Sequence, residues 1–309
     1  NHIGVDESIR DFTAAQNLAY LFCLTDRVEY ADKAIEIINA WSSTLKAVRG
    51  AGFNLQSGLI IPQLMGAADL IKHSCDRWSQ EDQARFQGFS EVILLPHVIN
   101  LRISINGNHD CATNMALAAL GIYLDDEFLF NRSINYYLHS KGYGSIAHYF
   151  LANGECQEDG RDMGHSRMGV RFFARIAGMA RNQGENIYDR FDYRLAAAME
   201  HYARVQMDYY TPAMYSSVHL SPLGLRGMID LSELQAYHYF THERNMPMPF
   251  MTRLIQITQD CDPTLLDQNQ LFLPDELTLS EAPSFPNINK STFSFGVIPF
   301  DGGALDKDT

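Results

Sequence analysis

The segment that decides the fold is Met115-Ala-Leu-Ala-Ala-Leu-Gly-Ile-Tyr-Leu-Asp-Asp-Glu-Phe-Leu-Phe-Asn-Arg-Ser-Ile-Asn-Tyr-Tyr-Leu138. Its apolar residues recur at helical spacing, Asp125-Asp126 interrupts them, and an aromatic-led helical pattern then resumes. Leu18–Trp41 and Val170–Tyr202 have the same organisation, although the three sequences are not close copies. Stacked αα-hairpins of this kind form a helical solenoid or a closed α/α toroid. The sequence therefore predicts an all-α fold, and we expect an α/α toroid, an incomplete barrel of stacked hairpins.

The remaining helical patterns fill most of the chain as far as residue 260. The predicted helices are 9–24, 30–45, 62–73, 79–95, 112–124, 128–138, 168–180 and 188–206. We expect Phe53–Ile61 to be a glycine-containing loop before the helix that starts at Pro62. Strand signals are nearly absent before Thr292–Phe300, which alternates weakly. We predict a toroid domain over residues 1–260 and an irregular C-terminal segment, 261–309, that packs on it.

Composition and charge exclude several classes of protein. The 309 residues are 46% hydrophobic and carry a net charge of −13, which argues against binding to nucleic acid or to an anionic membrane surface. No apolar run approaches the ~20 residues of a membrane span. We expect no cofactor and no metal, and the sequence leaves the oligomeric state open. The five cysteines form neither a disulfide framework nor a zinc motif: Cys23, Cys75, Cys111, Cys156 and Cys261.

Gly154–Gly169 is the most unusual polar stretch. It carries four acidic residues, two arginines and His165 between two apolar helical segments. Its glycines would let the backbone turn sharply and bring side chains close to a ligand. The alternative is a capping loop whose charges pair with one another. Val170–Met179 follows as a helix that stops near Gly184, so His165 is expected at the mouth of a helix.

A second polar turn, Asn106–Asp110, precedes the 112–124 helix. It occupies the same position in its hairpin as residues 160–165 do in the next one. In a toroid the two turns should therefore lie on the same rim of the central cleft. This inference raises four residues above the other polar residues: Asn108, His109, Arg161 and His165.

Three segments carry a resemblance to a known family: residues 30–45, Asn106-Gly-Asn-His109, and Gln157-Glu-Asp-Gly-Arg-Asp-Met-Gly-His165. The chain resembles the alginate lyase superfamily, most closely polysaccharide lyase family 38, up to about Arg204 and again over Tyr237–Arg253. The resemblance implies an α/α toroid that cleaves glucuronan or mannuronate-rich alginate, an acidic polysaccharide, by β-elimination. It also implies a secreted or periplasmic protein. The chain begins at Asn1 without a methionine and looks processed, so the lack of an export signal is uninformative.

β-Elimination needs a base for the C5 proton, an acid for the O4 leaving group, and donors that stabilise charge on the C6 carboxylate. Asn108 matches the neutralising asparagine of the family, and its alternative role is an N-cap. His165 matches the catalytic histidine and could act as base or neutraliser. Its alternative role is that of a buried, hydrogen-bonded structural histidine.

Several residues are expected to bind substrate. The resemblance places His109 where relatives often carry tryptophan, so it should shape a subsite. Arg161 could bind a carboxylate bidentately, or could instead hold Glu158 or Asp162 in place. The substrate-binding candidates are His109, Arg161, Asn106, Tyr215, Tyr239 and Glu158.

The family also uses a tyrosine near an Arg-Gly pair. Arg226-Gly227 is present, and Arg226 is a candidate catalytic contact to a carboxylate, but Ser232 stands near the expected tyrosine position. Tyr237 is the preferred substitute, with Tyr239 and Tyr215 as others. Each could instead be a core aromatic residue.

Three other functions compete with the lyase. A glycoside hydrolase would need two carboxylates across the cleft, whereas Glu158 and Asp162 share one loop. A non-catalytic or weakened uronan-binding toroid would tolerate the missing tyrosine. A metal site at His109, Asp110, Asp162 and His165 lacks the usual ligand spacing. Because the net charge is negative, the lyase should have a local positive cleft, which we expect Arg161, Arg226 and Arg167 to line.

Overall fold

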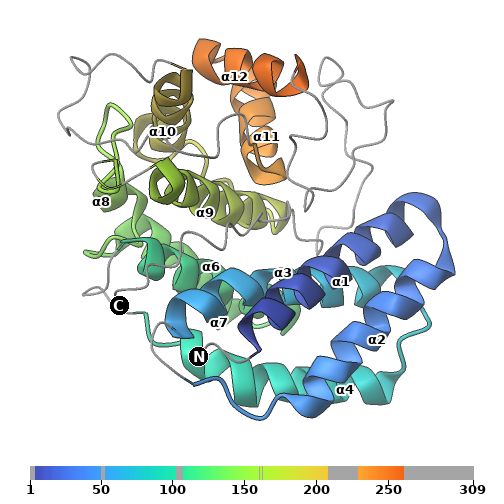
Figure 1. Ribbon diagram of the computed structural model, residues 1–309. Coiled ribbons are helices and arrows are strands. Elements are labelled where there is room, and N and C mark those ends of the chain that lie inside the picture. The colour runs from blue at the N-terminus through green and yellow to red at the C-terminus, as the bar shows by residue number, and fades with distance from the viewer. Residues whose placement is uncertain are drawn as a thin grey trace.

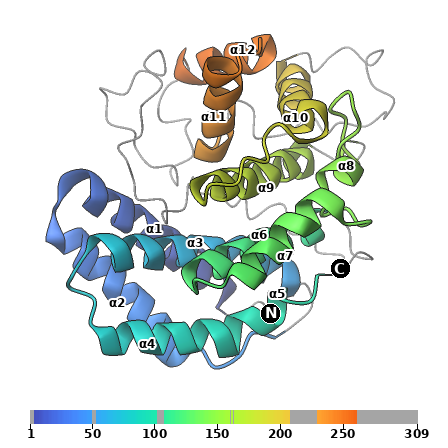
Figure 2. The same ribbon diagram turned by 180° about the vertical axis from the view of Figure 1, so that it is seen from behind.

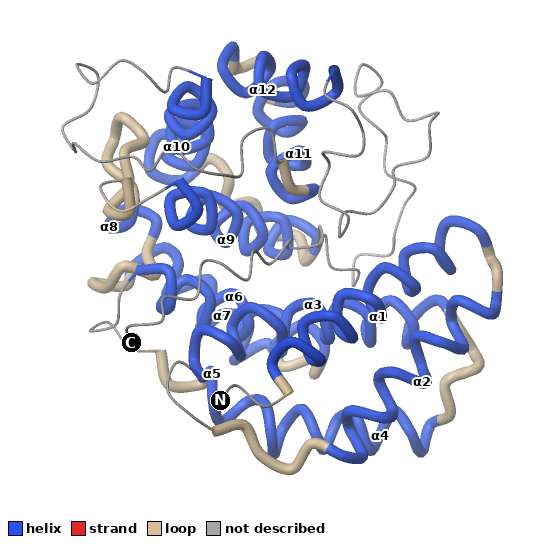
Figure 3. The backbone as a smooth tube through the Cα atoms, in the orientation of Figure 1, coloured by secondary structure: helices blue, strands red, loops and turns tan. Residues whose placement is uncertain are grey.

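The computed structural model describes residues 4–49, 53–101, 107–159, 161, 163–207 and 229–260. Apart from one isolated bridge between Phe150 and Cys156, all the regular structure in these residues is helical (Figures 1 and 3). The predicted all-α class is therefore confirmed. No helix among the described residues is long and apolar enough to cross a membrane. The C-terminal segment 261–309, including Thr292–Phe300, lies outside the described residues.

The first seven helices form the lower half of the molecule in Figure 1. They are α1 (Val5–Thr25), α2 (Val28–Thr44), α3 (Phe53–Ser74), α4 (Gln80–Phe89), α5 (Leu95–Val98), α6 (Gly107–Tyr123) and α7 (Glu127–His139). The π-helical turn η1 (Ser90–Leu94) joins α4 to α5. The upper half holds α9 (Met163–Asn182), α10 (Arg190–Met207), α11 (Leu231–His238) and α12 (Pro249–Asp260), with α8 (Ile146–Tyr149) beside α10. The π-helical turn η3 (Tyr239–Glu243) follows α11.

The helices pack in chain order. α1 packs on α2 and α3, α3 on α6, α6 on α7 and α9, and α9 on α10 and α11 (Figures 1 and 2). The three predicted hairpins are therefore real pairs: α1 with α2, α6 with α7, and α9 with α10. In the series α1, α3, α6, α9, α11 each helix packs on the next, as the inner helices of a toroid would, and the toroid itself stays a prediction.

Local start and stop signals are confirmed at several helix ends. The Ser79 hydroxyl accepts from the Asp82 N–H at 3.1 Å at the start of α4, and Asp126 caps α7 by accepting from Leu129 N–H at 3.0 Å. At the end of α9, Gly184 adopts a φ of 93°, the left-handed conformation that ends many helices. These signals involve only neighbouring residues, so the sequence is sufficient to find them.

The predicted loop at Phe53–Ile61 is wrong, because these residues form the first half of α3. Pro62 lies inside the helix, where it removes one backbone hydrogen bond without ending the helix. Gly58 does not make a turn. A Cβ atom there would come within 2.6 Å of the backbone of Ala112, so the glycine lets α3 cross α6 closely. Burial of α3 between α1 and α6 outweighs both helix-breaking residues.

The polar turns are also shorter than predicted. α6 begins at Gly107 and α9 at Met163, so Asn108, His109 and His165 all lie in first helical turns. In the 188–206 helix, residues 191–193 have left-handed backbone angles, with φ between 53° and 59°, and the regular helix follows them. At these helices the polar residues therefore belong to the helix and not to the turn before it.

Two buried contacts hold α9, one to the first half of the molecule and one to the start of α11. Tyr137 of α7 packs edge-on against Phe173 of α9, with ring centroids 5.2 Å apart. Asp230, before α11, accepts from Arg171 at 2.9 Å and from Arg175 at 2.7 Å, and all three side chains are buried. Together these contacts set the position of α9, whose first turn carries His165.

Candidate active site

The first turn of α6, the end of α8 and the first turns of α9 meet around Tyr149. The Tyr149 hydroxyl donates to Oδ1 of Asn108 at 2.7 Å. Its ring lies against two glycines: a Cβ atom would come within 2.7 Å of the ring at Gly107 and within 2.3 Å at Gly169. Gly169, which we expected to bend a loop, lies inside α9 and makes room for Tyr149. The ring thus spans the α6–α9 junction.

Asn108 presents a buried amide at this junction. Its side chain is 2% exposed, and in the part of the chain that the structure describes its Nδ2 has no hydrogen-bond partner. Leaving such a donor unpaired costs about 1–3 kcal/mol, and these exceptions call for an explanation such as a functional role or an ordered water. The expected N-cap alternative is wrong, because Oδ1 accepts from Tyr149 and not from a backbone N–H.

His109, Arg161 and His165 form a group of potentially cationic side chains next to Asn108. Burial lowers the pKa of His109 below its ordinary value, and the positive charges of Arg161 and His165 lower it further. These two residues are therefore close enough to act on His109 electrostatically. His165 is 8% exposed, whereas Arg161 lies at the surface. Arg161 and His165 thus lie within electrostatic reach of His109, the chain neighbour of Asn108, and a shared rim for the four residues stays a prediction.

The loop before α9 is held to α10 by a buried acid. Asp159 accepts from the Cys156 N–H at 2.9 Å and lies 2.9 Å from Nε2 of His201. Burial alone would raise the pKa of Asp159, but the hydrogen bond and charge of His201 outweigh it and leave that pKa below its usual value. Glu158, its neighbour, is also buried. Because the Glu158 carboxyl group is buried, it is badly placed to contact an anionic sugar, and its contact with substrate stays a prediction.

Asp110 is committed to a structural role. It accepts from the Tyr136 hydroxyl at 2.9 Å and from the Gly144 N–H at 2.7 Å. Among the described residues no group of three or more histidine, cysteine, aspartate or glutamate side chains could hold a metal ion. Asp162, the fourth member of the competing metal site, lies outside the described residues.

The two described candidate tyrosines have partners of their own. The Tyr237 hydroxyl lies 2.8 Å from Oγ1 of Thr252, and the residue is half-buried on α11. Tyr239 is buried, and its hydroxyl donates to Asp189 at 2.6 Å. The Tyr239 ring also lies under the guanidinium of Arg181, 4.6 Å from its centroid. These contacts give Tyr239 a structural role, and its contact with substrate stays a prediction.

The remaining candidates divide into two groups. Asn106, Tyr215 and Arg226 lie outside the described residues. Arg167 is described, and it is only 1% exposed. Burial and the charge of Arg171 lower the pKa of Arg167. The expectation that Arg167 lines an open positive cleft is therefore wrong: the packing of α9 turns this side chain inward.

Tyr149 is the site residue that sequence reasoning missed. It follows no motif, and it lies 41 residues from Asn108 along the chain. The available signal was indirect, since Gly107 and Gly169 both mark positions where a bulky neighbour excludes a side chain. A pair of glycines does not identify that neighbour, so only the packing could.

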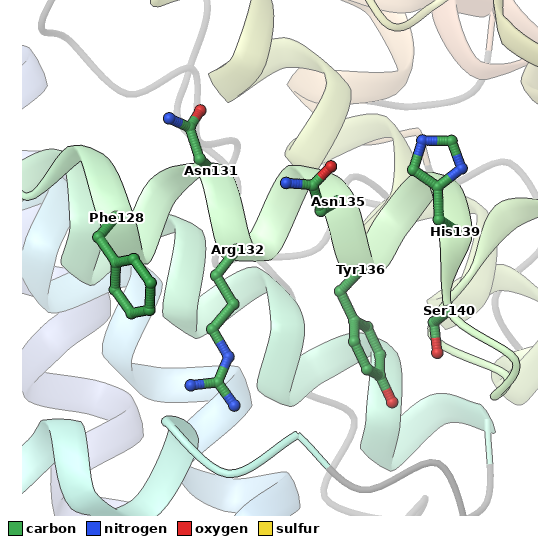
Figure 4. Close-up of a pocket in the computed structure, with 7 residues that line it drawn as sticks. All are labelled: Phe128, Asn131, Arg132, Asn135, Tyr136, His139 and Ser140. Carbon is green, nitrogen blue, oxygen red and sulfur yellow. The ribbon is translucent and has the colours of Figure 1, made fainter.

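A separate groove of about 440 Å³ runs along the outer face of α7. In Figure 4, Asn131, Asn135 and His139 point to one side of the helix, and Phe128, Arg132 and Tyr136 point to the other. None of the predicted site residues lines this groove. Of its residues, only Tyr136 connects to the junction, through its hydrogen bond with Asp110.

Chemically, the junction is suited to binding and neutralising an anionic group. A buried amide donor lies beside His109 in the chain, and Arg161 and His165 act electrostatically on His109. Such donors, placed in advance, stabilise negative charge that develops in a transition state.

The chain was compared with protein-family models and with curated proteins. A family model described as alginate lyase matches residues 5–208, about two thirds of the 309 residues. The match spans the first turns of both α6 and α9. No curated protein matches the chain.

Proposed function

The chain belongs to the alginate lyase family, and from this premise we propose that it cleaves a β-1,4-linked uronic acid polymer by β-elimination. The family supports a polysaccharide lyase in general and an acidic polysaccharide as its substrate. The proposed polymers are glucuronan and mannuronate-rich alginate. Their sugars share one configuration at C5, the carbon that loses its proton. We propose that the protein acts outside the cytoplasm, where such polymers are found.

The observation that carries this proposal is the buried Nδ2 of Asn108, which has no hydrogen-bond partner among the described residues. The C5 proton is too weakly acidic to be removed unless the neighbouring carboxylate is neutralised. Asn108 Nδ2 supplies a donor for a carboxylate oxygen, and it is already desolvated before substrate arrives. Since no group in the described residues accepts a hydrogen bond from Nδ2, the donor is available to strengthen its interaction as charge develops on the carboxylate.

The other groups of the junction take supporting roles. His165 removes the C5 proton or shares in neutralising the carboxylate. Arg161, at the surface, binds a uronate carboxylate, and His109 shapes the adjoining subsite. Tyr237 is the proposed tyrosine for the proton exchange at O4, and Arg226 is the proposed second carboxylate contact.

Ultraviolet absorbance tests the proposal directly, because elimination leaves an unsaturated uronate at the new chain end. The protein is incubated separately with glucuronan, polymannuronate and polyguluronate. We expect absorbance to rise with glucuronan or polymannuronate, and guluronate is the C5 epimer that serves as the stereochemical control. Asn108→Ala should lower kcat by about 10²–10³, and His165→Ala by about 10²–10⁴.

Other outcomes would identify the competing functions. New reducing ends without ultraviolet absorbance would mean hydrolysis, and the lyase proposal would be rejected. Binding of a polymer without any turnover would point to a non-catalytic uronan-binding protein. Full activity in both variants would refute the assignment of Asn108 and His165 while leaving the lyase itself intact.

A further inference from the structure

The position of Tyr149 is set independently of any ligand. Its ring packs against Phe150 at 4.8 Å and Phe173 at 5.3 Å between centroids. Gly107 and Gly169 lie against the ring from α6 and α9, and neither leaves space for a larger residue. A ring confined in this way has few alternative orientations, so the position of its hydroxyl is fixed. The hydroxyl oxygen lies 2.7 Å from Oδ1 of Asn108.

The hydrogen bond runs from the phenol to the amide oxygen. Burial raises the pKa of Tyr149 well above its ordinary value, and nearby acidic groups raise it further. The hydroxyl therefore keeps its proton and donates it. A protonated phenol can donate or accept, and here it donates to Oδ1, the acceptor atom of the amide. Nδ2 must then face away from Tyr149, and it has no partner among the described residues.

We infer that Tyr149 is a positioning residue, whose hydroxyl holds Oδ1 of Asn108 and thereby turns the Asn108 Nδ2 toward the substrate carboxylate. The inference rests on the proposed function, because it assumes that a carboxylate binds there. Tyr149 is not itself the base: it is 1% exposed, and its hydroxyl is already committed to Asn108. Its role is to prevent the amide from rotating and presenting oxygen to an anion.

The structure offers a matched control in Tyr137. This tyrosine is also fully buried, and its ring also packs on Phe173, at 5.2 Å. Its hydroxyl, however, has no hydrogen-bond partner in the described part of the chain. Tyr149→Phe and Tyr137→Phe each remove one buried oxygen from the same aromatic group. Only the first removes a hydrogen bond to Asn108.

The experiment measures kcat and KM on the cleaved polymer for the parent, Tyr149→Phe, Tyr137→Phe, Asn108→Ala and the double variant Tyr149→Phe/Asn108→Ala. Tyr149→Phe should lower kcat roughly three- to tenfold, the size of one hydrogen bond, with little change in KM. Tyr137→Phe should leave both constants unchanged. In the Asn108→Ala background, Tyr149→Phe should have no further effect, because the positioned amide is gone. Melting temperatures verify that every variant is folded.

An unchanged kcat in Tyr149→Phe would overturn the inference, and so would an equal loss with and without Asn108. If the parent forms no unsaturated product, it is the proposed function that fails. Whether the Tyr149 hydroxyl orients the Asn108 amide is then tested with the Asn108 side-chain amide signals in ¹⁵N nuclear magnetic resonance spectra. These signals are identified by their loss in Asn108→Ala. These signals should move in Tyr149→Phe and not in Tyr137→Phe. If they do not move, the contact does not orient the amide.

Discussion

Asn108 and Asp69 each have a buried polar atom that lacks a hydrogen-bond partner among the described residues, and the consequences differ. Asn108 lies at the junction of α6 and α9, where an incoming anion would satisfy its amide. Asp69 lies inside α3, 1% exposed, and in the described residues its Oδ2 has no hydrogen-bond partner. The nearest ionisable groups are Lys72 and His73 on the same helix and Tyr123 on α6. Asp69 therefore weakens the folded state when it is ionised.

The pH dependence of stability should report Asp69. Burial raises its pKa to about 8, although the charge of Lys72 partly opposes this. Between pH ~4 and ~8 the folded protein then holds a proton that the unfolded chain has lost, so stability falls as pH rises, by up to ~1.4 kcal/mol per unit. Asp69→Asn removes this term. The excess of its free energy of unfolding over that of the parent should grow as the pH rises from 5 to 8, and it should vanish only below pH ~4.

Urea denaturation of both proteins from pH 5 to pH 8 measures this difference. Titrating groups remote from Asp69 are common to the two proteins and cancel in the comparison. His73 does not cancel, because its Nε2 lies 3.5 Å from Oδ1 of Asp69, so both proteins are also compared in the His73→Gln background. Parallel stability curves across this range would show that Asp69 is already ionised in the folded protein.

At the scale of the element, Asp230 both caps the start of α11 and pairs with two arginines of α9. It forms a capping box at the start of α11: it accepts from the Ser232 N–H at 2.9 Å, and Glu233 accepts from the Asp230 N–H at 2.8 Å. It also accepts from Arg171 and Arg175 of α9. Burial alone would raise the pKa of Asp230, but the two guanidiniums hold it well below its usual range. One carboxylate thus begins α11 and fixes it on α9.

Asp230→Ala should therefore cost about 3–5 kcal/mol of stability, because it leaves two buried guanidiniums without this counter-ion. Asp32→Ala is the contrasting variant, since Asp32 forms an exposed pair with Arg77. Removing that exposed pair should barely change stability. Midpoints of urea unfolding measure both effects. Equal midpoints for the two variants would mean that the buried pair contributes no more than the exposed one.

For the whole molecule, the net charge of −13 opposes a polyanionic substrate. The cations expected in the cleft act over short distances, whereas the net charge acts over the Debye length. That length shortens from ~30 Å at 0.01 M salt to ~8 Å at 0.15 M. Salt should consequently screen the general repulsion more than it weakens contacts within the site.

We expect kcat/KM on the polymer to rise when ionic strength increases from about 0.01 to 0.15 M, the range over which the repulsion is screened. Arg161→Gln should show a steeper rise, because it lacks one local cation that offsets the repulsion. Initial rates at low substrate concentration measure both. A fall in kcat/KM over the same range would mean that a positive cleft, and not the net charge, controls the approach of the polymer.

Neighbouring residues were sufficient to predict the helical class, the three hairpins and the ends marked by Ser79, Asp126 and Gly184. Helical periodicity and caps depend on residues within a turn or two, so no tertiary information is needed. The same rules failed at Gly58 and Pro62. Contacts of α3 with α1 and α6, distant in sequence, stabilise a helix there that local propensity disfavours.

The candidate site divides in the same way. Motif and hairpin position were enough to propose that Asn108, His109, Arg161 and His165 share one rim, because equivalent helix starts lie at equivalent ends of stacked hairpins. Only the tertiary structure decided that Arg167 turns inward and that Tyr149 meets Asn108. The direction of a side chain along α9 and a contact across 41 residues both depend on how the helices pack. That packing depends on contacts between residues distant in sequence, so the spacing of neighbouring residues does not predict it.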